Sequence, residues 1–281
     1  MQSYDGGMSW NFQISPILAV SKVIVDPKTD DLNPPGSCRV LNNEIPPCYT
    51  IFAASQGSGV WRSDNQGDTW KQITAPGLTE TNVVSLALSP PKTTATMLYA
   101  GTEGGRVFKY VPDPTFPTDP TLGKWTEQTT SPVSTSFTPL LPRNPVSLAV
   151  HPGGTTFYAG LGGNKGGGGG GLWRSDDDGR HWDEVASILN VKPDSVYALN
   201  IIDLPNTTIY AGFSGLKRCL GSTACLDPAF WSNIAVPSDR GVSALAVDPY
   251  TQTLMITGNY IGELFRSADG GLTWTKIDIG N

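Results

Sequence analysis

Short apolar runs that end in proline recur along the chain. Four copies, VSKVIVDP, VVSLALSP, PVSLAVHP and VSALAVDP, begin at residues 20, 83, 145 and 242, and a looser copy without the final proline, VYALNIID, begins at residue 196. Such runs are typical of strands that are buried on both faces, and a proline at the end closes the strand. We therefore predict that each run forms the first strand of a repeated unit.

Two further strings follow each run and complete the pattern. Apolar strings that end in small residues occupy 49–55, 97–102, 156–161, 208–214 and 253–258, as in MLYAGT and TIYAGFS. Strings of the type GVWRS come next, at 59–63, 171–175 and 263–267, before an outer strand of the type TWKQIT. No segment shows a helical period over three turns. The pattern predicts units of four antiparallel strands.

A polar pattern, Ser-x-Asp-x-Gly-x-Thr-Trp, joins the third strand to the outer one. Ser and Asp side chains can hydrogen bond to the backbone of a turn, Gly supplies a positive φ, and Trp buries a large surface. We interpret the pattern as a structural hairpin turn. Its key positions are Ser3, Asp5, Gly7, Trp10; Ser63, Asn65, Gly67, Trp70; Ser175, Asp177, Gly179, Trp182; and Ser267, Asp269, Gly271, Trp274.

These units repeat at intervals of roughly 40–60 residues without helices between them, which predicts an all-β propeller of four-stranded blades. We expect one domain, residues 1–281, with blades at 15–78, 80–132, 143–190, 194–236 and 240–279 and a partial one at 1–14. The last blade has its own outer strand, so the partial unit does not complete it. We expect a chain that begins inside a larger ring; the alternative is a short ring with an extra hairpin.

The boxes resemble the Asp-box, or BNR, repeat of sialidases, sortilin-type receptors, xyloglucan-cleaving glycoside hydrolases and a photosystem II assembly factor. Those families share the blade and differ in their sites. The resemblance to the xyloglucan-cleaving enzymes implies a catalytic acid in a TDxGG-like loop between the second and third strands. The matching stretch here is TEGG, which makes Glu103 the candidate. Its counterparts Gln56 and Asn259 are not acids, Glu263 lies closer to a strand, and glycosidases need a second carboxylate.

Other residues with catalytic potential fit the repeat better than a site. The resemblance to sialidases would imply an arginine triad, but Arg62, Arg174 and Arg266 recur at one repeat position, so we interpret them as structural partners of neighbouring blades. His151 and His181 also occupy repeat positions and lack a nucleophile nearby. The adjacent aspartates of the third box lack the spacing of a calcium loop. We expect no metal or other cofactor.

Composition and cysteines narrow the class of protein. Charged residues make up 16% of the chain and the net charge is −6, which argues against a nucleic-acid or anionic-membrane surface. We expect two local disulfides, Cys38 with Cys48 and Cys219 with Cys225, and hence a location outside the cytosol. The first residues do not form a signal peptide, and no apolar run is long enough to span a bilayer. Asn206 begins a glycosylation sequon.

The loops leave the function open. Proline- and threonine-rich stretches at 112–124 and 130–145 are either binding loops or solvent-exposed insertions. We expect Tyr110, Phe116 and Tyr260 to be exposed aromatic residues, which could stack on sugars. We expect a non-enzymatic, exported module that binds another protein, a like subunit or a surface glycan. The alternative is a glycoside hydrolase of the xyloglucanase or sialidase type.

Overall fold

The computed structural model of the chain consists of β-strands and connecting turns. It describes residues 17, 19–26, 49–89, 97–116, 118–128, 145–151, 154–162, 171–185, 195–202, 207–221, 225, 227–237, 241–248, 251, 253–258 and 263–277. These residues contain strands β1 to β20 and a short 3₁₀ helix, η2 (Pro228–Phe230), and none of them lies in an α-helix. Within this part of the chain, no helix is long and apolar enough to cross a bilayer.

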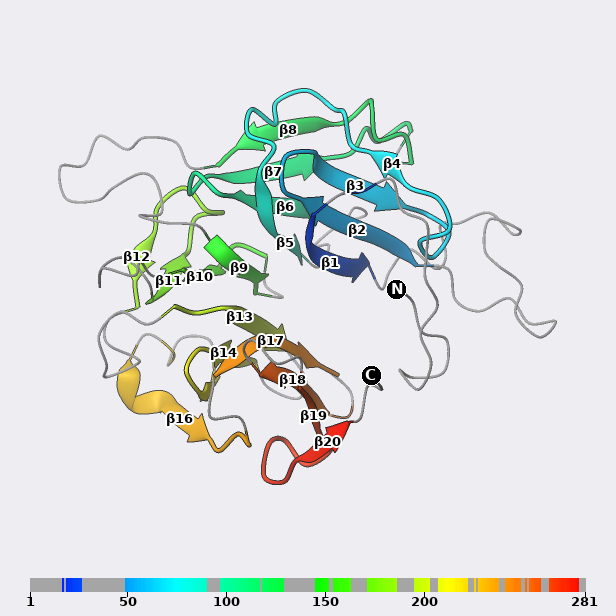
Figure 1. Ribbon diagram of the computed structural model, residues 1–281. Helices are drawn as coiled ribbons and strands as arrows, with labels where there is room; N and C mark the ends of the chain where they lie inside the picture. The colour runs from blue at the N-terminus through cyan, green and yellow to red at the C-terminus, as the bar shows by residue number, and fades with distance from the viewer. Residues whose placement is uncertain are drawn as a thin grey trace. The chain divides into compact units, whose positions relative to one another are not determined.

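The strands form five four-stranded antiparallel sheets, and each sheet uses four consecutive strands in meander order (Figure 1). The first sheet contains β1 (Val20–Asp26), β2 (Thr50–Ser55), β3 (Gly59–Ser63) and β4 (Lys71–Gln72). The second contains β5 (Val83–Ser89), β6 (Met97–Thr102), β7 (Val107–Val111) and β8 (Lys124–Glu127). The third contains β9 (Pro145–Val150), β10 (Phe157–Leu161), β11 (Gly171–Ser175) and β12 (Asp183–Glu184).

The last two sheets follow the same plan. The fourth contains β13 (Ala198–Ile202), β14 (Thr208–Gly212), β15 (Leu216–Leu220) and β16 (Trp231–Ile234). The fifth contains β17 (Val242–Val247), β18 (Leu254–Gly258), β19 (Leu264–Ser267) and β20 (Thr275–Ile277). The predicted all-β architecture of four-stranded antiparallel blades is confirmed. The number of blades in a closed ring, and the assignment of 1–281 to one domain, stay predictions.

The chain divides into two compact units, Met1–Thr130 with the first and second sheets and Ser131–Asn281 with the other three. In each unit, apolar side chains of neighbouring sheets pack against one another. The core of the first unit includes Phe52, Val60, Ile73, Leu86, Leu98, Phe108, Tyr110 and Trp125. The cores of the second unit include Tyr158, Leu172, Leu199, Ile209 and Trp231, and Tyr210, Leu216, Val242, Leu254 and Phe265. Burial of these side chains stabilises sheet-on-sheet packing.

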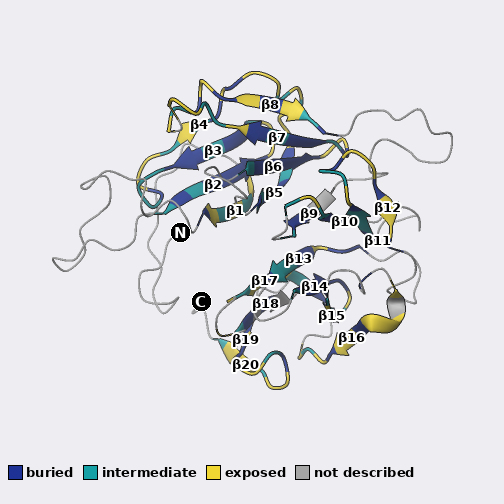
Figure 2. Ribbon diagram, turned by 180° about the vertical axis from the view of Figure 1, so that it is seen from behind, coloured by how far each residue is buried: buried dark blue, intermediate teal, exposed yellow. Residues whose placement is uncertain are grey.

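Among the residues whose burial is described, the second strand is the most buried in the first four sheets, and the outer strand is the least buried in the first three (Figure 2). We expected the first strand to be buried on both faces, and β5 is largely buried. In β1 this expectation is wrong, because Val23 and Val25 are 51% and 48% exposed while Ile24 packs against the core. Alternate residues point to opposite faces of a strand, and the second sheet packs against the face that carries Ile24.

Backbone hydrogen bonds attach neighbouring sheets to each other within each unit. They run from the amides of Gly57 and Gly59 to Thr81 O (3.2 and 2.9 Å), from Val196 to Leu161 O (3.1 Å) and from Val242 to Phe213 O (2.7 Å). All of these bonds lie where a first strand begins or a second strand ends. That end of each sheet also carries the turn between the second and third strands, because antiparallel neighbours reverse direction.

One of the two predicted disulfides is present. Cys219 in β15 is bonded to Cys225, with their Cα atoms 5.8 Å apart, and both side chains are buried. The indole of Trp231 donates a 3.0 Å hydrogen bond to Cys225 O, so the bridge also fixes the residue that opens β16. Several predicted positions lie outside the described residues: the first box (Ser3, Asp5, Gly7, Trp10), Cys38, Cys48, Asn206, Asn259 and Tyr260.

Candidate functional site

The second, third and fourth box turns are each built around a serine hydroxyl that accepts a hydrogen bond from the backbone amide of the box glycine. These bonds run from Gly67 to Ser63 (2.8 Å), from Gly179 to Ser175 (3.0 Å) and from Gly271 to Ser267 (2.8 Å). Two successive residues in each turn have positive φ: Gln66 and Gly67, Asp178 and Gly179, Gly270 and Gly271. Two such residues in a row are the requirement of a tight hairpin turn, and the three serines are buried.

The box carboxylate completes the turn, as the fifth sheet shows. Asp269 Oδ1 accepts hydrogen bonds from the hydroxyl of Ser267 (2.6 Å) and from the amides of Leu272 (3.0 Å) and Thr273 (2.9 Å). The hydroxyl of Thr273 also donates to this carboxylate. The hydrogen bonds from Ser267 and Thr273 lower the pKa of Asp269 strongly, because they favour the ionised form.

Both histidines belong to the framework of the third sheet. Burial opposes ionisation of Asp177, but hydrogen bonds from His181 and Ser175 outweigh burial and lower the pKa of Asp177. The His181 ring is paired with the Asp177 carboxylate inside the box turn. His151 Nε2 lies 3.3 Å from the hydroxyl of Thr207. These contacts give His151 and His181 structural roles.

A cation in the third strand faces an aromatic ring directly opposite it in the second strand in several sheets. The pairs and their distances to the ring centroid are Arg62 over Phe52 (5.9 Å), Lys109 over Tyr99 (5.5 Å) and Arg174 over Tyr158 (5.8 Å). Tyr210 and Arg218 are paired across strands in the same way. Such contacts are attractive when partly desolvated, and they explain why a cation recurs at this position.

The repeated arginines are also held by a carboxylate two residues later. Arg62 Nε lies 2.7 Å from Asp64 Oδ1, and Arg174 Nη2 lies 2.8 Å from Asp176 Oδ1. Burial raises the pKa of Tyr110 in the neighbouring sheet, and the charge of Arg62 partly offsets that rise. These contacts of Arg62 and Arg174 lie within their own sheets, whereas we expected contacts with neighbouring blades.

Glu103, the candidate catalytic acid, lies in the turn between β6 and β7 and is exposed. Its Oε2 accepts a 3.0 Å hydrogen bond from Asn82 Nδ2, and its backbone amide donates to Asn82 O (2.9 Å). The turn is therefore tied to the start of the first strand of the same sheet. A catalytic role for Glu103 stays a prediction.

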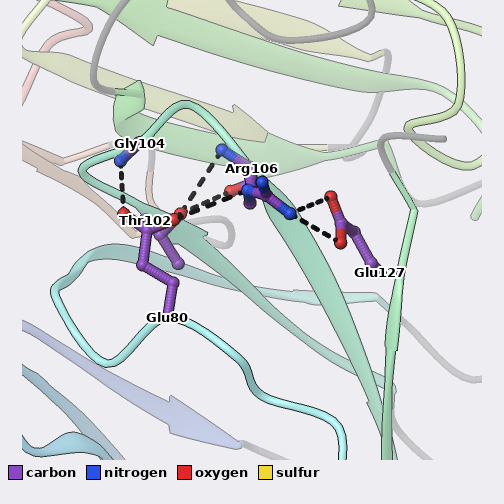
Figure 3. A network of polar contacts seen from close by, with 5 residues as sticks. All are labelled: Glu80, Thr102, Gly104, Arg106 and Glu127. Atoms are coloured by element: carbon purple, nitrogen blue, oxygen red, sulfur yellow. Dashed lines mark hydrogen bonds and ion pairs between the residues drawn. The ribbon is translucent and has the colours of Figure 1, made fainter. Parts of the chain in front are cut away.

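A second carboxylate that the sequence did not reveal, Glu80, supports the same turn. Glu80 Oε1 accepts a 2.7 Å hydrogen bond from the Gly104 amide, and Oε2 accepts one of 2.7 Å from the Thr102 hydroxyl (Figure 3). A Cβ atom on Gly104 would lie 2.6 Å from this carboxylate, so a larger residue at this position would displace the end of the Glu80 side chain. Glu80 precedes β5 and belongs to no repeated string, which is why periodicity does not single it out.

Arg106 links this turn to the outer strand. Its Nη1 atom donates to both carboxylate oxygens of Glu127 in β8, at 3.1 and 3.0 Å, and its Nε lies 3.9 Å from Glu80 Oε2. Figure 3 shows Arg106 between Glu80 and Glu127. Residues from the β4–β5 connection, the β6–β7 turn and β8 thus form one polar network, which we call the TEGG network (Glu80, Thr102, Gly104, Arg106 and Glu127).

The equivalent positions in other sheets differ. Gln56 lies in the turn between β2 and β3 and is exposed, and its backbone amide donates to Ala19 O (3.1 Å). Glu263 Oε1 accepts a 2.6 Å hydrogen bond from Lys276 Nζ across β19 and β20. Among the described residues, no group of three or more His, Cys, Asp or Glu is arranged to hold a metal ion.

Two of the aromatic residues proposed for sugar stacking, Tyr110 and Phe116, differ in their exposure to solvent. Tyr110 was expected to be exposed, and this expectation is wrong: it is 2% exposed, and its ring centroid lies 5.1 Å from that of Trp125 in the core. Its position in β7 points the ring toward the first sheet's apolar side chains, which accounts for the burial. Phe116, in the β7–β8 connection, is 58% exposed.

Comparisons with known proteins bear on the fold. No family model and no curated protein matches the chain. The structure is similar to that of a GH74 enzyme from Niastella koreensis, with a TM-score of 0.52 and 20% identity over 81% of this chain and 35% of that chain. A GH74 xyloglucanase from Xanthomonas campestris aligns with a TM-score of 0.45 and 16% identity over 81% of this chain and 43% of that chain.

This chain therefore spans 35% of the length of the Niastella enzyme. At 20% identity, that likeness shows the fold alone, a β-propeller of four-stranded antiparallel sheets.

Proposed function

We propose that this chain is a non-catalytic, exported β-propeller module that binds another protein, a like subunit or a surface glycan. The observation that carries the proposal is the TEGG network. Glu80 accepts two hydrogen bonds that hold the turn, and Glu127 is bound by Arg106. The carboxylates of Glu80 and Glu127 are thus engaged in structural contacts.

The surroundings of Glu103 also favour a binding role over catalysis. The general acid of a glycosidase lies in an apolar pocket that favours its protonated form, and a second carboxylate stands across the scissile bond. Glu103 is exposed, and its carboxylate is hydrogen bonded to the amide side chain of Asn82. This environment suits a surface residue that orders a turn.

The scaffold is arranged as binding proteins commonly are. The box turns are short, hydrogen bonded and similar in the second, third and fourth boxes, whereas the β7–β8 connection at 112–123 is long. Loops on a rigid framework are the usual place for binding residues. The Cys219–Cys225 disulfide supports export, since such bonds persist in oxidising compartments.

A specific observation keeps a second function in view, a glycoside hydrolase acting on an extracellular polysaccharide. The Gly104 amide that Glu80 binds directly follows Glu103, so two carboxylates serve the same turn. The solved structures with a similar fold include a GH74 enzyme. In this second function, Glu80 and Glu103 would be the acids to test.

Reducing-end release and binding, measured on the same preparations, separate these functions. The substrates are xyloglucan, mixed-linkage β-glucan and sialosides, and the proteins are the wild type, Glu103→Gln and Glu80→Gln. We expect the wild type to release reducing ends no faster than the two variants. We also expect it to be retained on at least one immobilised ligand or to self-associate in sedimentation. Release that disappears in Glu103→Gln or Glu80→Gln would overturn the non-catalytic proposal. A folded protein that neither binds nor self-associates would contradict the binding module.

A further inference from the structure

The first unit contains an open hollow between the outer strand of the first sheet and the long β7–β8 connection of the second sheet. Its volume is about 640 Å³, within the range of ligand sites. The residues that line it are Lys71, Gln72, Thr74, Phe116, Thr118, Asp119, Pro120 and Thr121. We call it the Phe116 hollow. It lies in a loop region that the TEGG network does not use.

The loop that carries Phe116 is held by its own hydrogen bonds. Asp113 Oδ1 accepts from the amides of Thr115 (2.8 Å) and Phe116 (3.2 Å), and Phe116 O accepts from the Asp119 amide (3.0 Å). Asp119 Oδ1 in turn accepts from the amide and the hydroxyl of Thr121, at 2.9 and 2.7 Å. These bonds engage both the amide and the carbonyl of Phe116, so a ligand need not order this residue.

The loop is also attached to the neighbouring sheet. The Ala75 amide donates to Pro120 O (3.2 Å), and the Trp125 amide donates to Pro76 O (2.8 Å). Residues 75 and 76 directly follow the segment of the first sheet that forms the opposite wall of the hollow. Both walls are therefore fixed relative to each other within this unit.

Phe116 offers a large apolar surface to solvent, because its side chain is 58% exposed. Covering an aromatic ring removes apolar area from water and is favourable in proportion to that area. A pyranose ring has a flat face of C–H groups that can lie on an aromatic ring, while its hydroxyls stay at the rim. The other residues of the hollow match such a rim.

The polar walls suit hydroxyl groups. Thr74 and Thr118 are exposed and carry hydroxyls that both donate and accept, as sugar hydroxyls do. Gln72 lies beside them and is oriented by the 2.8 Å hydrogen bond from its Nε2 to Ser58 O. An apolar platform with a few oriented polar groups is the usual composition of a small-ligand site.

The charges of the hollow balance each other. Hydrogen bonds from Thr121 lower the pKa of Asp119, and the charge of Lys71 lowers it further, so this carboxylate remains ionised near neutral pH beside a cation. A site with one cation and one anion gives neither a polyanion nor a polycation an advantage. The charge pattern therefore favours a neutral ligand.

We propose that the Phe116 hollow binds a neutral polysaccharide, with one sugar ring stacked on Phe116 and its hydroxyls hydrogen bonded to the threonine and glutamine side chains. The inference rests on the proposed function as a binding module and names its ligand class. It places that ligand at the outer edge of the first unit, away from the residues of the TEGG network.

Affinity gel electrophoresis tests the proposal with xyloglucan, mixed-linkage β-glucan and glucomannan, and with polygalacturonate as the charged counterpart. The variants are Phe116→Ala, which removes the platform, and Thr74→Trp, which fills the hollow from the other wall. The matched control is Leu122→Ala, a 48% exposed residue of the same loop that does not line the hollow. Circular dichroism and thermal melting establish that each variant is folded.

We expect at least one neutral polysaccharide to retard the wild type and Leu122→Ala. Loss of a central aromatic contact should weaken binding about tenfold or more in Phe116→Ala and Thr74→Trp. Phe116→Tyr should retain binding. Equal retardation of wild type and Phe116→Ala would overturn the hollow as the site while leaving the binding module standing. Retardation by polygalacturonate alone, or by no polysaccharide, would overturn the neutral-glycan ligand.

Discussion

The backbone amide of Gly271 donates a 2.8 Å hydrogen bond to the hydroxyl of Ser267, four residues earlier in the box turn of the fifth sheet. Gly271 has φ +94°, and a Cβ atom there would lie 2.6 Å from Cγ2 of Ile234 in the fourth sheet. The glycine thus meets two demands, a left-handed backbone and a close approach to the next sheet. The box turn is a contact between sheets as well as a hairpin.

Gly271→Ala should lower the free energy of unfolding by about 2–4 kcal/mol. Alanine is strained in a left-handed backbone conformation, and its Cβ atom would force the Ile234 side chain to shift. Gly270→Asn is the matched control, because Gly270 also has positive φ but the same position carries Gln66 and Asp178 in other boxes. Urea unfolding measures both. Similar losses in the two variants would contradict the close approach as the cause.

The box carboxylate should make stability depend on pH. The pKa of Asp269 is lowered in the folded state by the hydrogen bonds from Ser267 and Thr273. Its contribution is therefore complete above the unfolded pKa of about 3.9 and is lost as the pH falls toward the folded pKa. We expect Asp269→Asn to be less stable than wild type near pH 6, with the difference shrinking below about pH 4.

Urea unfolding at a series of pH values from about 6 down to about 2 measures this effect. Thr273→Val, which removes one of the side-chain donors, should show an intermediate dependence on pH. A difference between wild type and Asp269→Asn that stays constant with pH would show that the carboxylate's ionisation is not the source.

Removing the disulfide with Cys219→Ser and Cys225→Ser should cost about 2 kcal/mol, because the bridge closes a short loop. The indole of Trp231 binds Cys225 O, so its fluorescence should report the loosening of this loop. Thermal melting with and without a thiol reductant measures the cost for the wild type. If the reductant lowered the melting temperature of the double variant as much as that of the wild type, the loss of stability on reduction would come from other cysteines.

Glu80 and Glu103 should differ in their contribution to stability. Glu80→Ala removes the acceptor of two hydrogen bonds, from Thr102 and from Gly104, and should cost about 1–3 kcal/mol. Glu103→Ala removes an exposed carboxylate with a hydrogen bond from Asn82 and should change stability by less than about 0.5 kcal/mol. Chemical unfolding of both variants checks the order. A larger loss for Glu103→Ala would contradict the structural role of Glu80.

Much of the architecture was predictable because it depends on local patterns. Alternating apolar strings place the strands, and Ser-x-Asp-x-Gly places the turns, since the hydrogen bonds of Ser175 and Asp177 stay within a few residues. Cys219 and Cys225 are six residues apart, so a disulfide between them was easier to predict than one with a distant cysteine. The box turns and the disulfide are thus encoded by contacts of short range in sequence.

The candidate site was harder to predict, because it depends on contacts between segments far apart in sequence. Glu80 reaches Gly104 because the β4–β5 connection and the β6–β7 turn lie at the same end of the second sheet. The burial of Tyr110 depends on Trp125 and on the neighbouring sheet. The Phe116 hollow forms between the β7–β8 connection and the outer strand of the first sheet. The proline and threonine content of the connection therefore could not indicate which residues line the other side of the hollow.

The attachment between neighbouring sheets by backbone groups has a consequence for how such a chain can change. The Thr81 carbonyl that receives the amides of Gly57 and Gly59 would be present whatever side chain stood at that position. An attachment of this kind tolerates sequence drift in the connections. New ligand specificities can therefore be acquired in the loops, one substitution at a time, without dismantling the assembly of blades.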